Sequence, residues 1–185
     1  MKIGIIMGSI REGRNGEVVG TWVHEIASGR DDAEYELLDI AEFDLPLLAE
    51  PTPPSAANRQ YENEATRRWS QAIDACDGFV FVTGEYNHGI PGAFKNAFDL
   101  LAPEWGNKAV GFVSYGADSG TRAVEHWRGV VINNYLHSTR GQVVLNLFTD
   151  FGEQGFAPDE RKAKSVGNLL DELVPLAGAI KTLRD

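Results

Sequence analysis

The sequence predicts an α/β fold of three layers, in which helices cover both faces of a doubly wound, five-stranded parallel sheet. Short apolar runs alternate along the chain with longer segments whose apolar residues recur at helical spacing. Several of these runs are nearly continuous, as expected of strands that are covered on both faces. Such strict alternation is typical of parallel sheets with crossover helices. No linker, repeat or low-complexity tract interrupts it, so residues 1–185 are expected to form one domain.

Five apolar runs are the expected strands. They are Ile3–Met7, Tyr35–Asp39, Gly78–Thr83, Ala109–Ser114 and Gln142–Leu147. We expect the flavodoxin-like strand order 2-1-3-4-5, in which the topology switches between the first and third strands. Ligands of such sheets bind in the crevice at the carboxyl ends of the strands, near that switch.

Stripes of apolar residues at helical spacing mark five helices between and after the strands. The stripes are Val19, Trp22, Val23 and Ile26; Trp69 and Ile73 within residues 62–76; Phe94, Phe98 and Leu101 in a helix beginning at Pro91; Val124, Trp127 and Val131; and Val166, Leu169, Leu170 and Leu173. Pro175 is expected to kink or end the last helix, unless it begins a new turn, because it lacks a backbone N–H.

The connection formed by residues 43–58 is unusually long. It contains Pro46, Pro51, Pro53 and Pro54. Long ordered connections are often functional. A stiff surface loop or a contact between subunits explains the composition equally well, and the sequence leaves these interpretations open.

Composition and charge restrict the possible partners. The formal net charge of -10 argues against nucleic acid, because binding of many phosphates needs a basic face. Cys76 is the only cysteine, which excludes an intrachain disulfide and a cysteine-based metal cluster. The apolar run at residues 3–7 is too short for a signal peptide or a membrane span. We therefore expect a cytoplasmic protein without a membrane partner.

The loop after the first expected strand has the character of an anion site. Gly8 and Gly13 have the spacing of a Walker motif, but Arg14 and Asn15 stand where that motif needs Lys and then Ser or Thr. A nucleotide hydrolase is therefore disfavoured. Ser9, Arg11 and Arg14 can instead bind one phosphate monoester, together with amides at the start of the following helix. An ordinary turn with solvated arginines is the alternative.

The loop after the third expected strand suits a flat ligand. Residues 84–92 include Gly84, Gly89, Pro91 and Gly92, and no long aliphatic side chain occurs before Ile90. Such a composition is typical of a loop that presents backbone amides rather than side chains. Its place after a buried strand puts it at the same sheet edge as the first loop.

These two loops together resemble the NAD(P)H-dependent FMN reductase family, whose fold is flavodoxin-like. Members carry G-S-x-R after the first strand and P-E-Y-N-x-x-x-P-G-x-x-K-N after the third. This chain has Gly8-Ser9-Ile10-Arg11, and it has Glu85-Tyr86-Asn87 followed by Pro91-Gly92 and Lys95-Asn96. The second motif is long and specific, and the alternating pattern extends the resemblance over nearly the whole chain.

The resemblance implies a tightly bound FMN and a set of residues that hold it. Ser9 and Arg11 would bind the phosphate, with Arg14, Asn15 and Gly16 in the same loop. Glu85, Tyr86, Asn87 and His88 would lie along the isoalloxazine ring, mostly through backbone atoms. Ser114, Tyr115 and Gly116 would flank the ring and the ribityl chain. Two positions depart from the family, which often has Ser in the region of Gly16 and usually has Pro at position 84.

The remaining reactive side chains have ordinary interpretations. His24, His126 and His137 fall in or at the ends of expected helices without metal-ligand spacing, so no metal site is predicted. His88 could contact the ring or protonate a product, or it could lie in solvent. Cys76 is expected in the core. Lys95 and Asp99 are expected to form an ion pair, and Asn96 to cap its helix or contact a nearby loop. Trp105 and Tyr115 are either stacking partners of a ligand or core residues.

The leading hypothesis is an FMN-dependent oxidoreductase in which no side chain acts as a nucleophile. It would take a hydride from NADPH or NADH and pass electrons to free flavin, a quinone, an azo compound or a metal oxyanion. The alternative is a flavodoxin-like electron carrier that binds FMN and is reduced by a protein partner, which its acidic surface would suit. The resemblance further implies a homodimer or a homotetramer.

Overall fold

Five parallel strands form the central sheet of the computed structural model, which describes residues 1–152 and 155–184. The sheet order is β2-β1-β3-β4-β5, and every neighbouring pair is parallel. The strands are β1 (Lys2–Met7), β2 (Glu34–Asp39), β3 (Gly78–Gly84), β4 (Lys108–Gly116) and β5 (Leu136–Asn146). The expected fold class and strand order are therefore confirmed.

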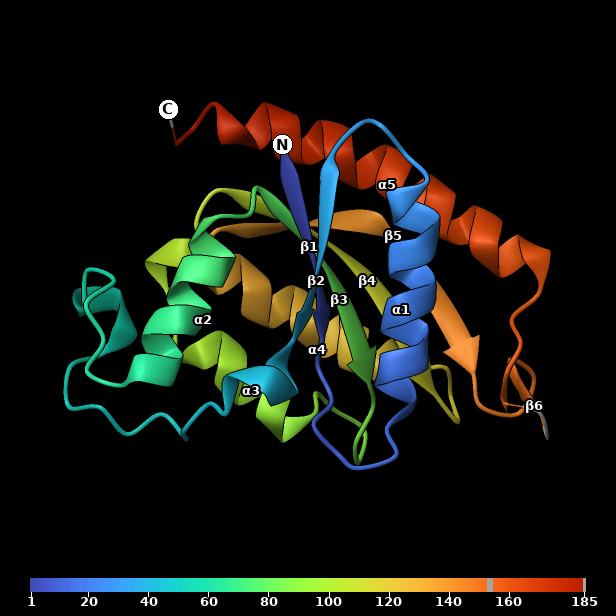
Figure 1. Ribbon diagram of the computed structural model, residues 1–185, viewed down its shortest axis with the longest axis horizontal. Coiled ribbons are helices and arrows are strands. Elements are labelled where there is room, and N and C mark those ends of the chain that lie inside the picture. The colour runs from blue at the N-terminus through green and yellow to red at the C-terminus, as the bar shows by residue number, and fades with distance from the viewer. Residues whose placement is uncertain (153–154, 185) are drawn as a thin grey trace.

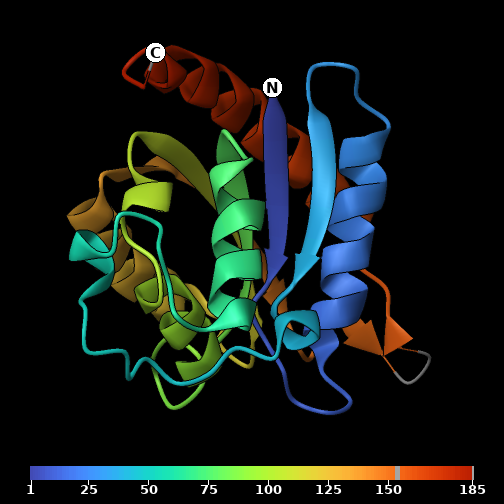
Figure 2. The same ribbon diagram turned by 60° about the vertical axis from the view of Figure 1, so that its left-hand side comes forward.

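Helices cover both faces of this sheet (Figures 1 and 2). α1 (Asn15–Ser28) and α5 (Glu160–Lys181) pack on one face, and α2 (Glu64–Asp74), α3 (Gly92–Asp99) and α4 (Thr121–Val131) on the other. Short 3-10 turns occur at Ile40–Phe43, Pro54–Ala56, Pro103–Trp105 and Ile132–Asn134. A small antiparallel pair, β6 (Phe151–Gly152) and β7 (Gly155–Phe156), follows β5 and was not expected.

The two faces of the sheet bury different side chains. Under α1 and α5 the core is mainly aliphatic, with Val80 and Val113 of the sheet among its members. Under α2, α3 and α4 it is aromatic, and the rings of Phe98 and Trp105 stack there with centroids 4.8 Å apart. β3 and β4 are buried along their whole length, which explains their continuous apolar sequences.

Some expected boundaries were wrong. β5 begins at Leu136 rather than at Gln142, so His137 lies in a strand and not at a helix end. The segment was missed because it is a half-exposed edge strand whose polar residues hide the pattern. Pro175 does not end α5, which continues to Lys181. This proline lies on the exposed side of the helix, where water can satisfy the carbonyl group that loses its partner.

Side-chain hydrogen bonds at several places hold the long connection between β2 and α2 against the rest of the protein. The Asn96 side chain of α3 donates a hydrogen bond to the Pro46 carbonyl (2.8 Å) and accepts one from the Leu48 N–H (3.0 Å). Further along, the Tyr61 hydroxyl donates to the buried Glu104 carboxylate at 2.8 Å. Asn96 thus contacts a neighbouring loop, which was one of its two expected roles.

The carboxyl ends of the parallel strands meet at one end of the molecule, opposite the two chain termini (Figure 1). The loop after β1, residues 8–14, and the loop after β3, residues 85–91, both lie at this end. We call them the first loop and the ring loop. The third loop, residues 117–120, follows β4 at the same edge.

Candidate functional site

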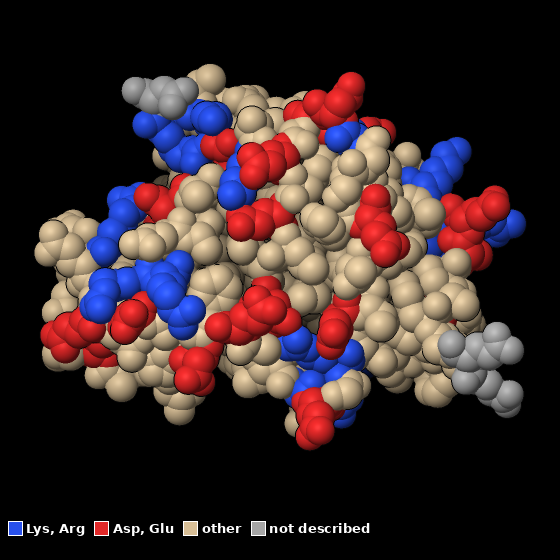
Figure 3. Space-filling view, viewed as in Figure 1, with Lys and Arg blue, Asp and Glu red and all other residues tan. Residues whose placement is uncertain are grey.

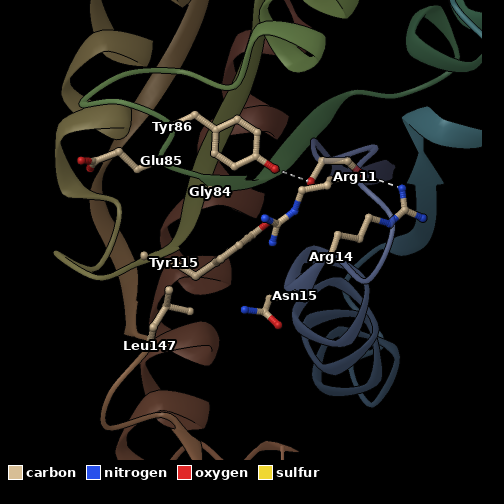
Figure 4. A pocket seen from close by; sticks show the side chains of 10 residues that line it. Arg11, Arg14, Asn15, Gly84, Glu85, Tyr86, Tyr115 and Leu147 are labelled. Atoms are coloured by element: carbon tan, nitrogen blue, oxygen red, sulfur yellow. Dashed lines mark hydrogen bonds between the residues drawn. The ribbon is translucent and has the colours of Figure 1, made fainter.

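A cavity of about 240 Å³ opens at the carboxyl ends of the strands, where the three loops meet (Figure 4). Its lining comes from both sides of the topological switch between β1 and β3. The lining residues are Ser9, Arg11, Arg14, Asn15, Gly84, Glu85, Tyr86, Tyr115, Gly116 and Leu147. A ligand site at this switch is what the sheet topology predicts.

The first loop is held from both sides. A Cβ atom at Gly8 would lie 1.8 Å from a ring carbon of Phe94, so α3 packs directly against the loop backbone. On the other side, Arg14 forms an ion pair with Asp39 at the end of β2, and its Nη1 donates to the Ser9 carbonyl at 2.6 Å. Arg14 therefore fixes the shape of the loop, and part of its charge is balanced by Asp39.

Groups that suit an anion remain free in this loop. The N–H groups of residues 9–15 donate no hydrogen bond to the described part of the chain, and no side chain caps the N-terminus of α1. Arg11 is exposed and lines the cavity. Within residues 1–152 and 155–184, its side chain has no hydrogen-bond or ion-pair partner. A helix N-terminus with open amides and an adjacent guanidinium favours a phosphate.

The ring loop turns through two residues in the left-handed conformation. Asn87 and His88 have φ of 49° and 71°, and Tyr86 and Gly89 exchange two backbone hydrogen bonds of 3.1 Å across the turn. Positive φ at both central positions is the geometry of a type I′ turn, which favours Asn. The N–H groups of Asn87 and His88 have no acceptor among the described residues and are open to a ligand.

Side chains connect the ring loop to its neighbours. The Tyr86 hydroxyl lies 3.0 Å from the Ser9 Oγ and so bridges to the first loop. The Glu85 carboxylate, only 6% exposed, accepts hydrogen bonds from Arg122 Nε (2.5 Å) and from the Arg122 backbone N–H (3.2 Å) at the start of α4. Glu85 thus lines the cavity while its carboxylate is turned away from the centre of the cavity and anchors the loop to α4 (Figure 4).

The third loop is also rigidly held. The Ser114 hydroxyl donates to the Ser119 carbonyl at 2.7 Å, and the Asn146 side chain at the end of β5 donates to the Ala117 carbonyl at 2.7 Å. Leu147 follows β5 and donates its backbone N–H to the Gly116 carbonyl at 3.1 Å. These contacts fix the wall of the cavity that Tyr115 and Gly116 form.

Most of the expected site residues come together at the cavity. Those that line it are Ser9, Arg11, Arg14, Asn15, Glu85, Tyr86, Tyr115 and Gly116. Gly16 lies beneath it in the first turn of α1, Ser114 is fully buried, and Asn87 is exposed at the tip of the ring loop. Leu147 also lines the cavity and was not expected to. Its place just after the fifth strand follows the rule that ligands bind at the carboxyl ends of parallel strands.

His88 faces a different place. It lines a separate, smaller hollow with Thr121, Arg122, Glu125 and His126. His126 thus lies near the ring loop, which its position in the sequence did not indicate. A direct role for His88 stays a prediction.

Other residues follow their ordinary interpretation. Cys76 is buried and burial raises the pKa of its thiol to about 11, so it is not a reactive thiolate. Trp105 is a fully buried core residue. The Lys95 ammonium and the Asp99 carboxylate form the expected ion pair at 2.5 Å. Among the described residues, no group of three or more His, Cys, Asp or Glu side chains could hold a metal ion.

The surface charge supports the assignment of the first loop. Acidic side chains are spread over the face shown in Figure 3, in keeping with the net charge of -10. Basic side chains, with acidic ones beside them, lie at its lower edge, at the place that the first loop has in Figure 1. Because Arg14 is paired with Asp39, the positive charge that an anionic ligand would meet at this loop is that of Arg11.

Comparison with known proteins agrees with this site. The sequence model of the NADPH-dependent FMN reductase family matches residues 1–150. This chain belongs to that family. A curated NAD(P)H-dependent FMN reductase, ntnL of a Nectria species, is 45% identical over 126 residues, which are 66% of this chain and 63% of the relative. The chain thus spans somewhat less than two thirds of that relative's length.

Two further curated relatives match over longer stretches. The NAD(P)H-dependent FMN reductase LOT6 of Saccharomyces cerevisiae is 33% identical over 153 residues, 78% of each chain. A 2-hydroxy-1,4-benzoquinone reductase of a Burkholderia species is 30% identical over 183 residues, 93% of this chain and 87% of the relative. The expected family is therefore confirmed.

Solved structures confirm the flavodoxin-like fold of this FMN reductase family member. The flavoenzyme NAD(P)H:(acceptor) oxidoreductase FerB of Paracoccus denitrificans superposes with a TM-score of 0.75 at 21% identity, covering 96% of this chain and 97% of FerB. A flavodoxin of Streptococcus pneumonia gives a TM-score of 0.62 at 13% identity, covering 95% and 99% of the two chains.

Proposed function

We propose that this protein is an FMN-dependent oxidoreductase that takes a hydride from NADPH or NADH and passes electrons to a small acceptor. The observation that carries the proposal is one cavity lined both by the first loop, with its anion-binding groups, and by Gly84, Glu85 and Tyr86 at the start of the ring loop, at the sheet edge where the family motifs lie. The acceptor classes that fit are free flavin, a quinone, an azo compound or a metal oxyanion.

The residues of the cavity fit FMN. Its single phosphate would meet the open amides of residues 9–15 with Ser9, Arg11 and Asn15, while the ring would lie along residues 84–89. When bound, FMN supplies the hydride chemistry at its ring. The protein would contribute backbone N–H groups as fixed dipoles, and those of Asn87 and His88 at the tip of the ring loop have no acceptor among the described residues.

Anchoring of the loops is the second contribution of the protein. Ser9 and Tyr86 join the first loop to the ring loop, and Arg122 holds Glu85 in place. Preorganised donors need no rearrangement when charge appears, which is why we expect rigid loops rather than an acid–base pair at this site. This accounts for a family motif that lacks a nucleophile.

We further propose that the protein works as a homodimer or a homotetramer in the cytoplasm. A second hollow of about 230 Å³ next to the first loop is lined mostly by apolar residues, including Ile10, Leu45 and Leu47. Leu47 is 80% exposed and Ile10 is 57% exposed. Such exposed apolar side chains around a groove favour a protein contact. Within the described residues, none of the helices is both long enough and apolar enough to cross a membrane.

Rapid mixing under anaerobic conditions tests the proposed activity. FMN-loaded protein mixed with NADPH or NADH should lose its yellow colour without any added protein, and a quinone should restore it. A flavodoxin-like carrier would keep its colour until a reductase partner is added. Failure of both nucleotides to bleach the flavin would contradict the proposal and leave the electron carrier as the better interpretation.

A further inference from the structure

Tyr115 holds an unusual place in the cavity. It lies near the end of β4 and only 7% of its surface is exposed. Its ring extends from β4 toward the first loop, and its hydroxyl end lies on the side of Arg11 (Figure 4). The side chain therefore reaches the anion site from the opposite wall.

The hydroxyl of Tyr115 is available to a ligand. The Ser9 side chain lies within hydrogen-bonding reach of the Tyr115 hydroxyl, and the Ser9 hydroxyl also pairs with Tyr86 at 3.0 Å. Apart from this contact with Ser9, the Tyr115 hydroxyl has no hydrogen-bond partner within residues 1–152 and 155–184, so no acceptor there takes its proton. A phenol that is buried to this degree usually has a hydrogen-bond partner. The open amides and Arg11 beside it favour an anion as that partner.

Two glycines make room for this ring. A Cβ atom at Gly16 would lie 2.8 Å from the Tyr115 hydroxyl oxygen, and one at Gly84 would lie 3.2 Å from the ring carbon Cε2. These are the two positions at which the sequence departs from the family pattern. One side chain thus explains both departures, because the ring occupies space that larger residues at positions 16 and 84 would need.

The short distance between position 16 and the Tyr115 hydroxyl indicates that this hydroxyl occupies the place of a side chain at position 16. A serine at position 16 would begin its side chain 2.8 Å from the Tyr115 oxygen, so the two hydroxyls would compete for one place. Burial raises the pKa of Tyr115 to about 12, which keeps the phenol a neutral donor at every working pH.

We propose that Tyr115 determines specificity at the anion site, by donating its hydroxyl to the phosphate monoester of the flavin in the place of a serine at position 16. The inference rests on the proposed function, since it needs a flavin in the cavity. It assigns Tyr115 to the phosphate, whereas the sequence placed it beside the ring and the ribityl chain.

Binding of two flavins tests this role. Tyr115→Phe removes the hydroxyl and keeps the ring, so FMN should bind about tenfold more weakly, as expected for loss of a hydrogen bond to a charged group. Riboflavin lacks the phosphate, and its affinity should stay within about twofold, as for a change that removes no contact. Tyr135→Phe, at a residue that is 68% exposed, is the matched control and should change neither affinity.

A relocated hydroxyl gives a second, independent readout. Gly16→Ser alone should weaken FMN binding, because its side chain meets the Tyr115 oxygen. The double variant Gly16→Ser, Tyr115→Phe should recover much of the FMN affinity, because it carries the donor on α1 and removes the clash. The deciding comparison is with Tyr115→Phe alone, which is free of the clash and lacks the donor. The double variant should bind FMN more tightly than Tyr115→Phe, and equal affinity of these two variants would overturn the role of the hydroxyl as a phosphate donor.

The outcomes separate the two proposals. If the wild type binds neither flavin, the proposed function fails and this inference with it. If the wild type binds FMN and Tyr115→Phe binds it equally well, the role of Tyr115 is overturned while the proposed function stands. Equal loss of FMN and riboflavin affinity would assign Tyr115 to the ring side and would also overturn the inference.

Discussion

Gly8 shows how one missing side chain holds two parts of the site together. It follows β1 directly and begins the first loop, and its N–H donates to the Val82 carbonyl at 3.0 Å. The Phe94 ring fills the space where a Cβ atom would be. Because Phe94 is fully buried and cannot move away, the first loop can approach α3 only if position 8 is glycine.

We predict that Gly8→Ala destabilises the protein by about 3 kcal/mol, because a methyl group overlaps the buried ring of Phe94. Urea unfolding measures the free energy directly. Gly178→Ala in α5 is the matched control, since nothing lies within 4 Å of that position. It should stabilise the protein by about 0.5–1 kcal/mol through helix propensity. A loss below about 0.5 kcal/mol in Gly8→Ala would show that the contact is not as tight as described.

The contact between Glu85 and Arg122 gives a second prediction for single residues. Glu85→Gln and Arg122→Gln should each weaken FMN binding about three- to tenfold, because each frees the ring loop from α4. The double variant should bind FMN about as tightly as whichever single variant has the lower affinity, since the contact between Glu85 and Arg122 can be lost only once. Independent, multiplying losses would show that Glu85 does not act through Arg122. Titration of FMN fluorescence provides the affinities.

Among the connecting elements, the long loop between β2 and α2 resolves an ambiguity of the sequence. It is an ordered segment tied to α3 through Asn96 and to the turn after α3 through Glu104. Glu104 is fully buried and also accepts the Ser70 hydroxyl at 2.6 Å. The loop therefore forms a fixed wall of the apolar hollow beside the first loop.

We predict that Asn96→Ala releases the first half of this loop. Both side-chain hydrogen bonds to Pro46 and Leu48 are lost, so amide hydrogens of residues 46–50 should exchange at least about tenfold faster. Tyr61→Phe acts only on the second anchor and should leave exchange in residues 46–50 unchanged. Uniform exchange across the loop in both variants would contradict the two separate anchors.

The elements that were predicted well have strong local patterns. β3 and β4 are continuous apolar runs and are buried throughout. In the first six residues of β5, apolar and polar residues follow no regular pattern, because this edge strand is half exposed. Contacts between distant residues leave no local pattern at all. Arg122 lies 37 positions from Glu85, and the reach of Tyr115 to the first loop depends on glycines in two other elements.

Across the whole molecule, the ends of the sheet have different chemistry. The carboxyl end holds the cavity, and the opposite end buries Lys108 at the start of β4. Its ammonium donates to the Ile73 and Asp74 carbonyls, at 2.7 and 3.1 Å, and so caps the C-terminus of α2. Burial lowers the pKa of Lys108 from 10.5 to about 8.

This shift predicts how the contribution of Lys108 to stability depends on pH. Between pH 8 and 10.5 the unfolded state binds more protons at this lysine than the native state, so its contribution to the unfolding free energy rises with pH. The slope is at most about 1.4 kcal/mol per pH unit. The unfolding free energy of the wild type minus that of Lys108→Met should therefore rise with pH over this range. A difference that stays constant with pH would contradict the lowered pKa.

The topology made most of the cavity predictable, because parallel strands bring their carboxyl ends to one edge. From the sequence, that rule located the first loop, the ring loop and residues 114–116, although the last three form the end of β4 rather than a loop after it. The pairing of charged side chains in the folded protein was less predictable. Arg14, expected to bind phosphate, lies against Asp39, so Arg11 is the guanidinium turned to the cavity without such a partner among the described residues.

Native mass measurement of the purified protein with added FMN tests the central claim most directly. We predict that one FMN binds per chain, in an assembly with an even number of chains, and that Arg11→Ala loses most of the bound FMN while keeping its assembly. A protein that stays free of FMN at saturating concentration, or an Arg11→Ala variant that retains FMN fully, would contradict the assignment of this cavity as the flavin site.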